Sequence, residues 1–377
     1  METRTVPFFN YPELYRQHQE DFDKIITDVL SRGAYIMQRD LFEFEAQLAD
    51  YLNVKHAIGV ADGTMALLLS CIAAGISEGD EVIVPSHTFV ASASSIHHSG
   101  GVPVLCDCGP DNLIDADSVK KLLTSRTKAI MPVQLNGRTA NMDPILEIAE
   151  EHGLKIIEDS CQALGSKFKN RFAGTFGAAG TFSFFPAKTL GAFGDAGAVV
   201  TNDSAIAERI VGLRDHGRDH RTNTVTQFGF NARLDNLQAA ILMYRLSKYD
   251  DYVKYRRGIA EIYQAALQEI EDLVLPPGPH ADADHFDVFQ NYELRSGRRD
   301  ELRAHLDQHG VGTILQWGGS CLHQFSALEL RAECPNTEIL TTEFMMIPMN
   351  TVMTFDDARY VSSLIRSFYG LPKDFEA

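Results

Sequence analysis

Lys188 lies where an amine could react with a bound carbonyl compound. It follows an apolar run that ends at Phe184, and Pro186 interrupts this run before a glycine-rich loop leads to the next strand near Gly197. An amine that forms an imine must be partly deprotonated, and burial away from carboxylates lowers the pKa of a lysine in that direction. We therefore predict an imine-forming lysine here. The alternative is an ordinary lysine on a surface loop.

Asp159 is a carboxylate that follows an apolar run in the segment KIIEDSCQALGS, residues 155–166. Asp159 stands where a buried parallel strand should end. The carboxyl ends of parallel strands face the ligand crevice of an α/β sheet, so we expect Asp159 to face that crevice. The alternative is a helix N-cap.

Two further segments carry groups suited to an anion and to a flat ring. In GVADGTMALLLS, residues 59–70, Gly63 and Thr64 begin an apolar helix after a strand. Backbone N–H groups and a hydroxyl at such a position bind anions. In VIVPSHTFVASA, residues 82–93, Phe89 follows a strand and is suited to stack on an aromatic ring. A simple helix cap and a core aromatic are the alternatives.

Short apolar runs alternate with helical patterns between about residues 38 and 250, which predicts an α/β domain with a largely parallel sheet. The predicted strands are His56–Val60, Glu81–Pro85, Val102–Cys106, Ala129–Val133, Lys155–Glu158, Gly180–Phe184 and Ala198–Thr201. The predicted helices, with apolar residues at three- and four-residue intervals, include Asp40–Tyr51, Thr64–Ala74, Met142–Glu151 and Ala205–Arg214.

The pattern changes after about residue 250. Leu234–Tyr263 has the pattern of a long helical stretch, and the loop LPPGPHADAD precedes a strand-like segment, His285–Arg295. We therefore predict a large α/β domain, residues 1–250, and a small C-terminal α+β domain, residues 251–377. Within the small domain we expect a helix over Arg299–His309, extended chain over Gly312–Trp317 and a helix over Phe355–Tyr369.

Composition disfavours several classes of protein. The 34 Lys+Arg and 51 Asp+Glu give a net charge of -17 without a long basic run, so we expect no nucleic-acid partner. No stretch of about 18 apolar residues occurs and no signal segment is visible, so we expect a cytoplasmic protein without a membrane partner. The six cysteines form no CxxC pair, so we expect free thiols and no metal site.

Taken in order, five segments resemble the DegT/DnrJ/EryC1/StrS family of sugar aminotransferases, and the resemblance runs through most of the chain. These segments are GAYIMQRDLFEFEAQLADYLNVKHAIGVADGTMAL, GDEVIVPSHTFVASASSI, GLKIIEDSCQALGS, SFFPAKTLGAFGDAGAVVTND and GFNARLDNLQAAIL. The resemblance implies the aspartate-aminotransferase-like fold, PLP fold type I. It also implies pyridoxal 5'-phosphate (PLP) as the cofactor, which alternates with pyridoxamine phosphate (PMP).

The same resemblance, carried over position by position, implies roles around the cofactor ring. Lys188 would form the Schiff base, and Asp159 would hold the pyridine nitrogen protonated so that the ring accepts electrons. Gln162 would lie beside the 3-hydroxyl of the ring, and Phe89 would stack on its face.

The resemblance also implies how the cofactor phosphate is bound. Gly63, Thr64 and Ser183 match positions that bind the phosphate, and Asn231 matches an asparagine given by the neighbouring subunit. This implies an obligate homodimer with shared active sites. Arg233 is a candidate for the sugar-nucleotide region.

The reaction implied is a ping-pong transamination. Glutamate is the usual amino donor of the family, and the acceptor would be a keto sugar, most often linked to a nucleotide. Lys188 would act as general base and acid in both half-reactions.

One departure from the family pattern bears on the substrate. Gln316 and Trp317 stand where many relatives carry a His-Tyr pair near the sugar diphosphate, so they are candidate substrate residues. The Trp317 ring either stacks on a base or sugar or packs the small domain. An acceptor without a nucleotide, such as a cyclitol or aminoglycoside precursor, therefore stays open.

A PLP-binding regulator without turnover is the alternative from another class, because a fold does not fix a function. The intact Lys188, Asp159 and Gln162 favour the enzyme.

Overall fold

A seven-stranded sheet forms the centre of the fold. The computed structural model describes residues 4–219 and 221–375. The strands lie in the order β1-β9-β8-β5-β4-β2-β3. Of these strands β9 alone runs antiparallel to its neighbours, and the remaining pairs are parallel. The predicted α/β fold with a mostly parallel sheet is confirmed. The bounds are β1 His56–Val60, β2 Glu81–Pro85, β3 Val102–Cys106, β4 Thr127–Ile130, β5 Lys155–Asp159, β8 Ala179–Ser183 and β9 Gly197–Thr201.

These strands are short apolar runs, and β2 and β9 are buried along their whole length. Such burial requires helices on both faces of the sheet. Helix α4 packs against β8 and β9, and α3 and α8 pack against β1. The helices of this part are α3 Arg39–Leu52, α4 Gly63–Ala73, α5 Val90–His98, α6 Ala116–Leu122, α7 Met142–His152 and α8 Ser204–Arg214, with the 3-10 turn η1 Leu135–Gly137.

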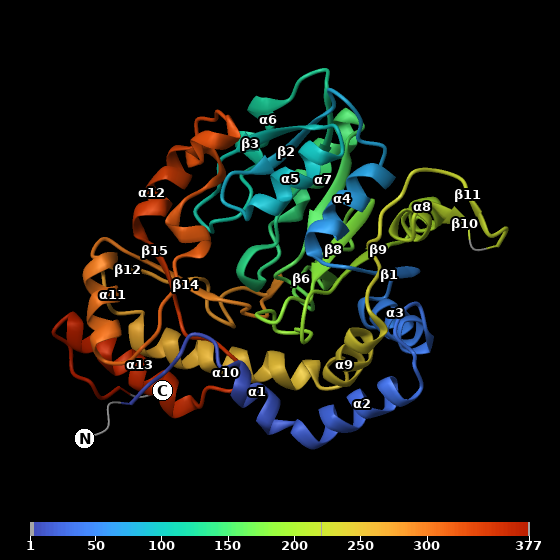
Figure 1. Cartoon of the computed structure of the whole chain (residues 1–377). Coiled ribbons are helices and arrows are strands. Elements are labelled where there is room, and N and C mark those ends of the chain that lie inside the picture. Colours follow the sequence, from blue (N-terminus) through green and yellow to red (C-terminus); the bar gives the residue numbers. More distant parts are fainter. Residues whose placement is uncertain (1–3, 220, 376–377) are drawn as a thin grey trace.

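A second hydrophobic core lies in the C-terminal part of the chain, at the left and bottom of Figure 1. An antiparallel sheet in the order β12-β14-β15 packs there with α10, α11 and α13. The bounds are α10 Tyr249–Leu267, β12 Leu273–Val274, β14 Tyr292–Ser296, α11 Arg299–Gln308, η2 Gln316–Gly319, η3 Leu322–Gln324, η4 Ser326–Leu328, α12 Pro335–Glu343, β15 Phe344–Ile347 and α13 Phe355–Phe368.

The predicted long helical stretch over Leu234–Tyr263 is helical, but it is divided into two helices. The chain forms α9 Asn236–Leu246 and then α10, with a break at Ser247 and Lys248. The Ser247 hydroxyl donates to the carbonyl oxygen of Tyr244 at 2.7 Å. A side chain that bonds the preceding turn competes with the helical hydrogen bonds, and Lys248 departs from helical backbone angles at φ -116° and ψ 6°.

The predicted extended segment Gly312–Trp317 is non-helical up to Leu315, but its last two residues belong to a 3-10 turn. It makes one isolated bridge, between Ile314 and Met346. The chain then enters η2, where Trp317 and Gly318 have φ of 51° and 74°. Left-handed backbone of this kind ends an extended strand.

The predicted strand-like segment His285–Arg295 is divided between two sheets. Its first part, β13 His285–Phe286, pairs with β6 Lys167–Phe168, which also pairs with β7 Arg171–Phe172. Its second part is β14 in the C-terminal sheet. The residues between β13 and β14 therefore connect the two parts of the fold.

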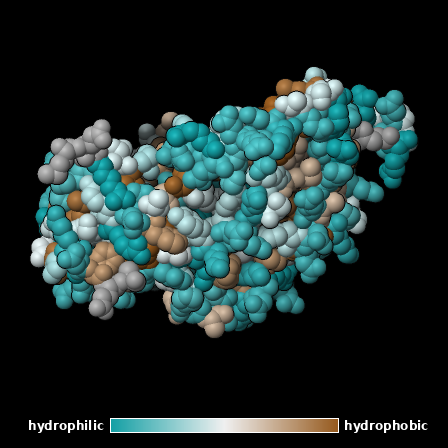
Figure 2. Space-filling model, turned by 90° about the horizontal axis from the view of Figure 1, so that it is seen from below, coloured by the Kyte–Doolittle hydropathy of each residue, from teal (hydrophilic) through white to brown (hydrophobic). Residues whose placement is uncertain are grey.

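A hairpin of β10 Arg218–Asp219 and β11 Thr224–Val225 projects from the body beside α8 (Figure 1). The helices α1 Tyr11–Gln17 and α2 Gln19–Ser31 run along the bottom of the same view, where α2 packs against α9. The face in Figure 2 is mostly hydrophilic, with scattered apolar groups.

The six cysteines are free thiols, as predicted. Among the described helices none is long and apolar enough to cross a bilayer.

Glu158 in β5 is a buried carboxylate that organises the loop before β8. Its oxygens accept hydrogen bonds from the Gln134 amide and from the backbone N–H groups of Gly174, Phe176 and Gly177. Burial raises the pKa of Glu158, and the hydrogen bonds from Gly174, Gln134 and Phe176 oppose that rise. The carboxylate thus satisfies donors that otherwise have no acceptor in the interior.

We expect Glu158→Met to destabilise the cofactor-free protein by at least about 3 kcal/mol, because each buried donor left unpaired costs about 1–3 kcal/mol. Glu158→Gln keeps one acceptor oxygen and should lose less. Urea unfolding followed by circular dichroism measures both. Unfolding midpoints equal to that of the unsubstituted protein would contradict this role of Glu158.

Candidate active site

Lys188 lies in the connection between β8 and β9, as the sequence indicates. The loop is closed by backbone hydrogen bonds from Ala192 N–H to the Phe184 carbonyl and from Phe184 N–H to the Ala196 carbonyl, each 2.7 Å. The buried Arg245 guanidinium donates to the carbonyl oxygens of Thr189 and Gly191. The loop is therefore fixed from α9 as well as from the sheet.

The surroundings of the Lys188 amine shift it toward the neutral state that imine formation requires. Burial lowers the pKa of Lys188, and the nearby Cys161 and Asp159 oppose that shift. Within residues 4–219 and 221–375 the amine makes no hydrogen bond and no ion pair to a carboxylate. The neutral amine is therefore favoured relative to a solvated lysine.

Asp159 is the last residue of β5 and is buried. One of its oxygens accepts from the Ser92 hydroxyl at 2.7 Å, and the other accepts from the backbone N–H of Cys161 at 3.2 Å. These two donors fix the carboxylate at the carboxyl edge of the sheet. A carboxylate held in a fixed orientation is suited to bind a protonated ring nitrogen.

Gln162 follows in the turn after β5. Its side-chain oxygen accepts from the backbone N–H of Asn136 at 2.9 Å and from the Asn291 amide at 3.3 Å. Gln162, Cys161, Ser183 and Lys188 line one small cavity. The structure thus brings Gln162 next to the lysine.

The N-terminus of α4 reaches the same place. Asp62 caps the helix by accepting from Met65 N–H at 2.8 Å, and the N–H groups of Gly63 and Thr64 have no partner within the helix. A Cβ atom on Gly63 would lie 2.8 Å from the Ser183 Cβ. The glycine therefore lets a helix N-terminus approach the Ser183 hydroxyl, which makes a cradle suited to phosphate.

Three other predicted residues lie on the surface or at its edge. Phe89 is 52% exposed at the start of α5. Asn231 is exposed at the base of the hairpin, where its backbone bridges to Asp215. The Arg233 guanidinium lies 3.3 Å from Asp215. In this single chain Asn231 is not among the residues that line a cavity with Lys188.

The predicted substrate residues Gln316 and Trp317 contact interior side chains, unlike the three surface residues above. Gln316 is buried, and its amino group donates to the side-chain oxygen of Asn136 at 2.7 Å and to Glu293 at 2.6 Å. The Trp317 ring lies against the buried His87 ring, with centroids 4.9 Å apart. The amide of Gln316 is therefore engaged in the interior.

Sequence reasoning did not single out Asn136, Asn291 or Cys161, which contact or adjoin the predicted residues. The Asn-Gly turn at residues 136–137 was a visible signal, because Asn136 has φ 56° and Gly137 has φ 90°. The contacts of Asn291 had no local signal, because they depend on how a segment far along the chain packs.

Relatives of known name were found for most of this chain. It is 40% identical over 318 residues to a protein of Streptomyces venezuelae named dTDP-3-amino-3,4,6-trideoxy-alpha-D-glucose transaminase, covering 84% of this chain and 83% of that one.

Solved structures match this fold closely. DesV of S. venezuelae, in complex with a ketimine intermediate, superposes with a TM-score of 0.93 at 36% identity, covering 97% of this chain and 99% of that chain. NtdA from Bacillus subtilis with bound cofactor PMP superposes with a TM-score of 0.88 at 28% identity, covering 97% of this chain and 86% of that chain.

The amine of Lys188, the carboxylate of Asp159 and the glycine cradle at Gly63 fit such a cofactor, and the cofactor of this chain is pyridoxal phosphate. A family model described as the DegT/DnrJ/EryC1/StrS aminotransferase family matches residues 16–366. This chain belongs to the DegT/DnrJ/EryC1/StrS aminotransferase family.

Proposed function

We propose that this chain transfers an amino group from glutamate to a keto sugar linked to a nucleotide, with Lys188 as the lysine that binds PLP. The observation that carries the proposal is the half-buried Lys188, whose amine pKa is lowered by burial and which makes no hydrogen bond to the nearby Asp159. The name of the S. venezuelae relative, a dTDP-sugar transaminase, supports the nucleotide-linked acceptor.

When bound, PLP supplies an electron sink that stabilises negative charge on the substrate carbon. Lys188 takes up a proton at its Nζ atom and returns it, acting first as base and then as acid. Because burial lowers the pKa of Lys188, more of the amine is neutral near neutral pH than for a solvated lysine.

Asp159 is proposed to keep the ring nitrogen protonated. The Ser92 hydroxyl and the Cys161 N–H hold both carboxylate oxygens, so Asp159 cannot turn away toward solvent. We propose that Gln162 donates to the 3-oxygen of the ring and that Phe89 stacks on the face of the ring.

The proposed phosphate site is the N-terminus of α4. The N–H groups of Gly63 and Thr64 and the Ser183 hydroxyl converge there, and the positive end of the helix dipole favours an anion. We propose Arg233 as a contact of the sugar nucleotide.

We further propose a homodimer with shared active sites. The projecting hairpin leaves Val225 at 66% exposure and Phe228 at 102% exposure. Apolar side chains that stand free of the body are suited to bury against a second copy. Asn231, at the base of this hairpin, would then reach the phosphate site of the partner subunit.

We also propose that the chain divides near residue 250 into domains 1–250 and 251–377, because the C-terminal part has a hydrophobic core of its own. Residues 1–3, 220 and 376–377 of these domains lie outside the described chain.

The first test is an absorbance spectrum of the protein loaded with PLP. We expect visible absorbance that falls when glutamate is added, and no such lysine-linked absorbance in Lys188→Ala. A protein that loads PLP but does not respond to glutamate or other amino donors would favour the regulator. A protein that binds no PLP would contradict the proposed function.

We expect Asp159→Asn to lower turnover by at least about a hundredfold, the range found when one fixed electrostatic group is lost. The amide keeps the shape of the carboxylate but not the charge that holds the ring proton. Steady-state assays with matched PLP occupancy measure this effect. Retained activity at full PLP loading would remove the role given to Asp159.

Subunit complementation tests the shared site. Co-expressed Lys188→Ala and Asn231→Ala chains should recover about one quarter of full activity, because random pairing gives half heterodimers with one intact site each. Lys188→Ala mixed with Asp159→Ala is the control and should recover nothing, since both residues belong to one subunit. Equal results for the two mixtures would argue against shared sites.

A further inference from the structure

The segment between β13 and β14 contacts the two residues that flank Lys188 and the side chain of Gln162. We infer that Gln290 and Asn291, consecutive in this segment, are positioning residues for Lys188 and for Gln162. This inference rests on the proposed function, because both targets act there on the cofactor.

Gln290 is buried, and its amide bonds the backbone on both sides of Lys188. Its amino group donates to the Ala187 carbonyl oxygen at 2.9 Å. Its oxygen accepts from the backbone N–H of Thr189 at 2.8 Å and from the Thr189 hydroxyl at 2.9 Å. Fixing the peptide groups before and after a residue limits the directions its side chain can take. Gln290 therefore restricts where the Lys188 amine points.

Asn291, together with the backbone of Asn136, holds the Gln162 amide in one orientation. Its amino group donates to the Gln162 oxygen at 3.3 Å and to the Asn136 side-chain oxygen at 2.9 Å. The backbone N–H of Asn136 also donates to the Gln162 oxygen. A backbone N–H cannot accept, so the orientation of the Gln162 amide follows from its partners. The Gln162 amino group is then left to donate to a ligand.

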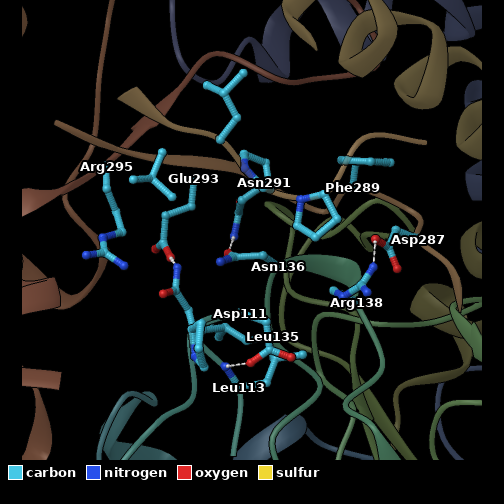
Figure 3. A pocket seen from close by; sticks show the side chains of 16 residues that line it. Asp111, Leu113, Leu135, Asn136, Arg138, Asp287, Phe289, Asn291, Glu293 and Arg295 are labelled. Carbon is cyan, nitrogen blue, oxygen red and sulfur yellow. Dashed lines mark hydrogen bonds and ion pairs between the residues drawn. The ribbon is translucent and has the colours of Figure 1, made fainter. Parts of the chain in front are cut away.

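Asn136 and Asn291 point toward one another across the depression in Figure 3. Asn136 is fixed in turn by Gln316, which also donates to the buried Glu293. The Glu293 carboxylate lies 3.5 Å from the ring of His87. The buried Gln316 amide therefore holds Asn136, which in turn donates to Gln162.

The segment itself is rigidly held. The buried Arg256 guanidinium donates to the carbonyl oxygens of Phe289 at 2.7 Å, of Gln290 at 2.5 Å and of Met349 at 2.7 Å. Burial lowers the pKa of Arg256 to about 10. On the other side, a Cβ on Gly137 would lie 2.5 Å from the backbone nitrogen of Gln290, so only glycine allows this close approach. Both contacts fix the positions of Gln290 and Asn291.

The test uses full-length protein loaded with PLP and two nearly isosteric variants, Gln290→Met and Asn291→Leu. The first readout is the pH midpoint of the visible absorbance change. Negative charge on the ring 3-oxygen favours the proton on the Lys188 nitrogen that is bonded to the cofactor. A hydrogen bond donated by Gln162 to this oxygen weakens that effect, and Asn291→Leu should disturb the donor. We therefore expect Asn291→Leu to raise this midpoint by about one pH unit, a tenfold change in the proton equilibrium.

For Gln290→Met we expect the rate at which glutamate removes the visible absorbance to fall at least about tenfold, because a mispositioned reactive group is costly. Gln290→Glu keeps the oxygen that accepts from Thr189, so its rate should lie between those of Gln290→Met and the unsubstituted protein. Gln324→Met is the matched control, since that amide also joins two segments, through Cys321 N–H and the Thr341 hydroxyl, but contacts no residue next to Lys188.

The inference is overturned if the Gln290 and Asn291 variants load PLP and match the unsubstituted protein in midpoint and rate, or if Gln324→Met changes both readouts equally. If a variant fails to fold, Gln290→Glu and Asn291→Asp take its place, and each should show the same direction of change. Failure of the proposed function is recognised separately: in that case the unsubstituted protein itself develops no visible absorbance with PLP. Failure of the positioning inference shows only in the variants.

Discussion

A lysine amine that is buried loses its hydration, and the half-buried Lys188 donates no hydrogen bond to a carboxylate in the described chain. Its loop must therefore be held by groups that add no negative charge. Backbone bonds close the loop on Phe184, and Arg245 binds its carbonyl oxygens. Amide and carbonyl partners fix the loop without favouring the protonated amine, and so the lowered pKa of Lys188 and its fixed position are compatible.

The parallel sheet supplies the other half of the arrangement. Neighbouring strands β5 and β8 end at Asp159 and Ser183, so the carboxylate and the hydroxyl lie at one edge. The N-terminus of α4 reaches this edge because glycines leave room for it. A Cβ on Gly197 would lie 2.4 Å from the backbone of Asp62. Close packing of backbone on backbone is what brings the helix dipole to the place where an anion fits.

The two hydrophobic cores meet at the connection before β14. Arg256 of α10 binds the carbonyl oxygens of this connection, and the Asn136–Gly137 turn of the large sheet packs against it. Residues from the C-terminal half thus contact both Gln162 and the Lys188 loop. Any shift of one part of the fold against the other would break or lengthen these hydrogen bonds, because buried polar networks have few alternative partners.

The sequence by itself determined the α/β fold, the strands of the central sheet, and the placement of Lys188 and Asp159 at its carboxyl edge, because these follow from local apolar periodicity and from strand ends. It did not determine the break of the long helix at Ser247, where a side-chain bond competes with the backbone. Only the tertiary structure placed Gln316 in the interior and Asn291 against Gln162. Those hydrogen bonds join residues more than a hundred positions apart, and no local pattern encodes which distant partner a buried amide will find.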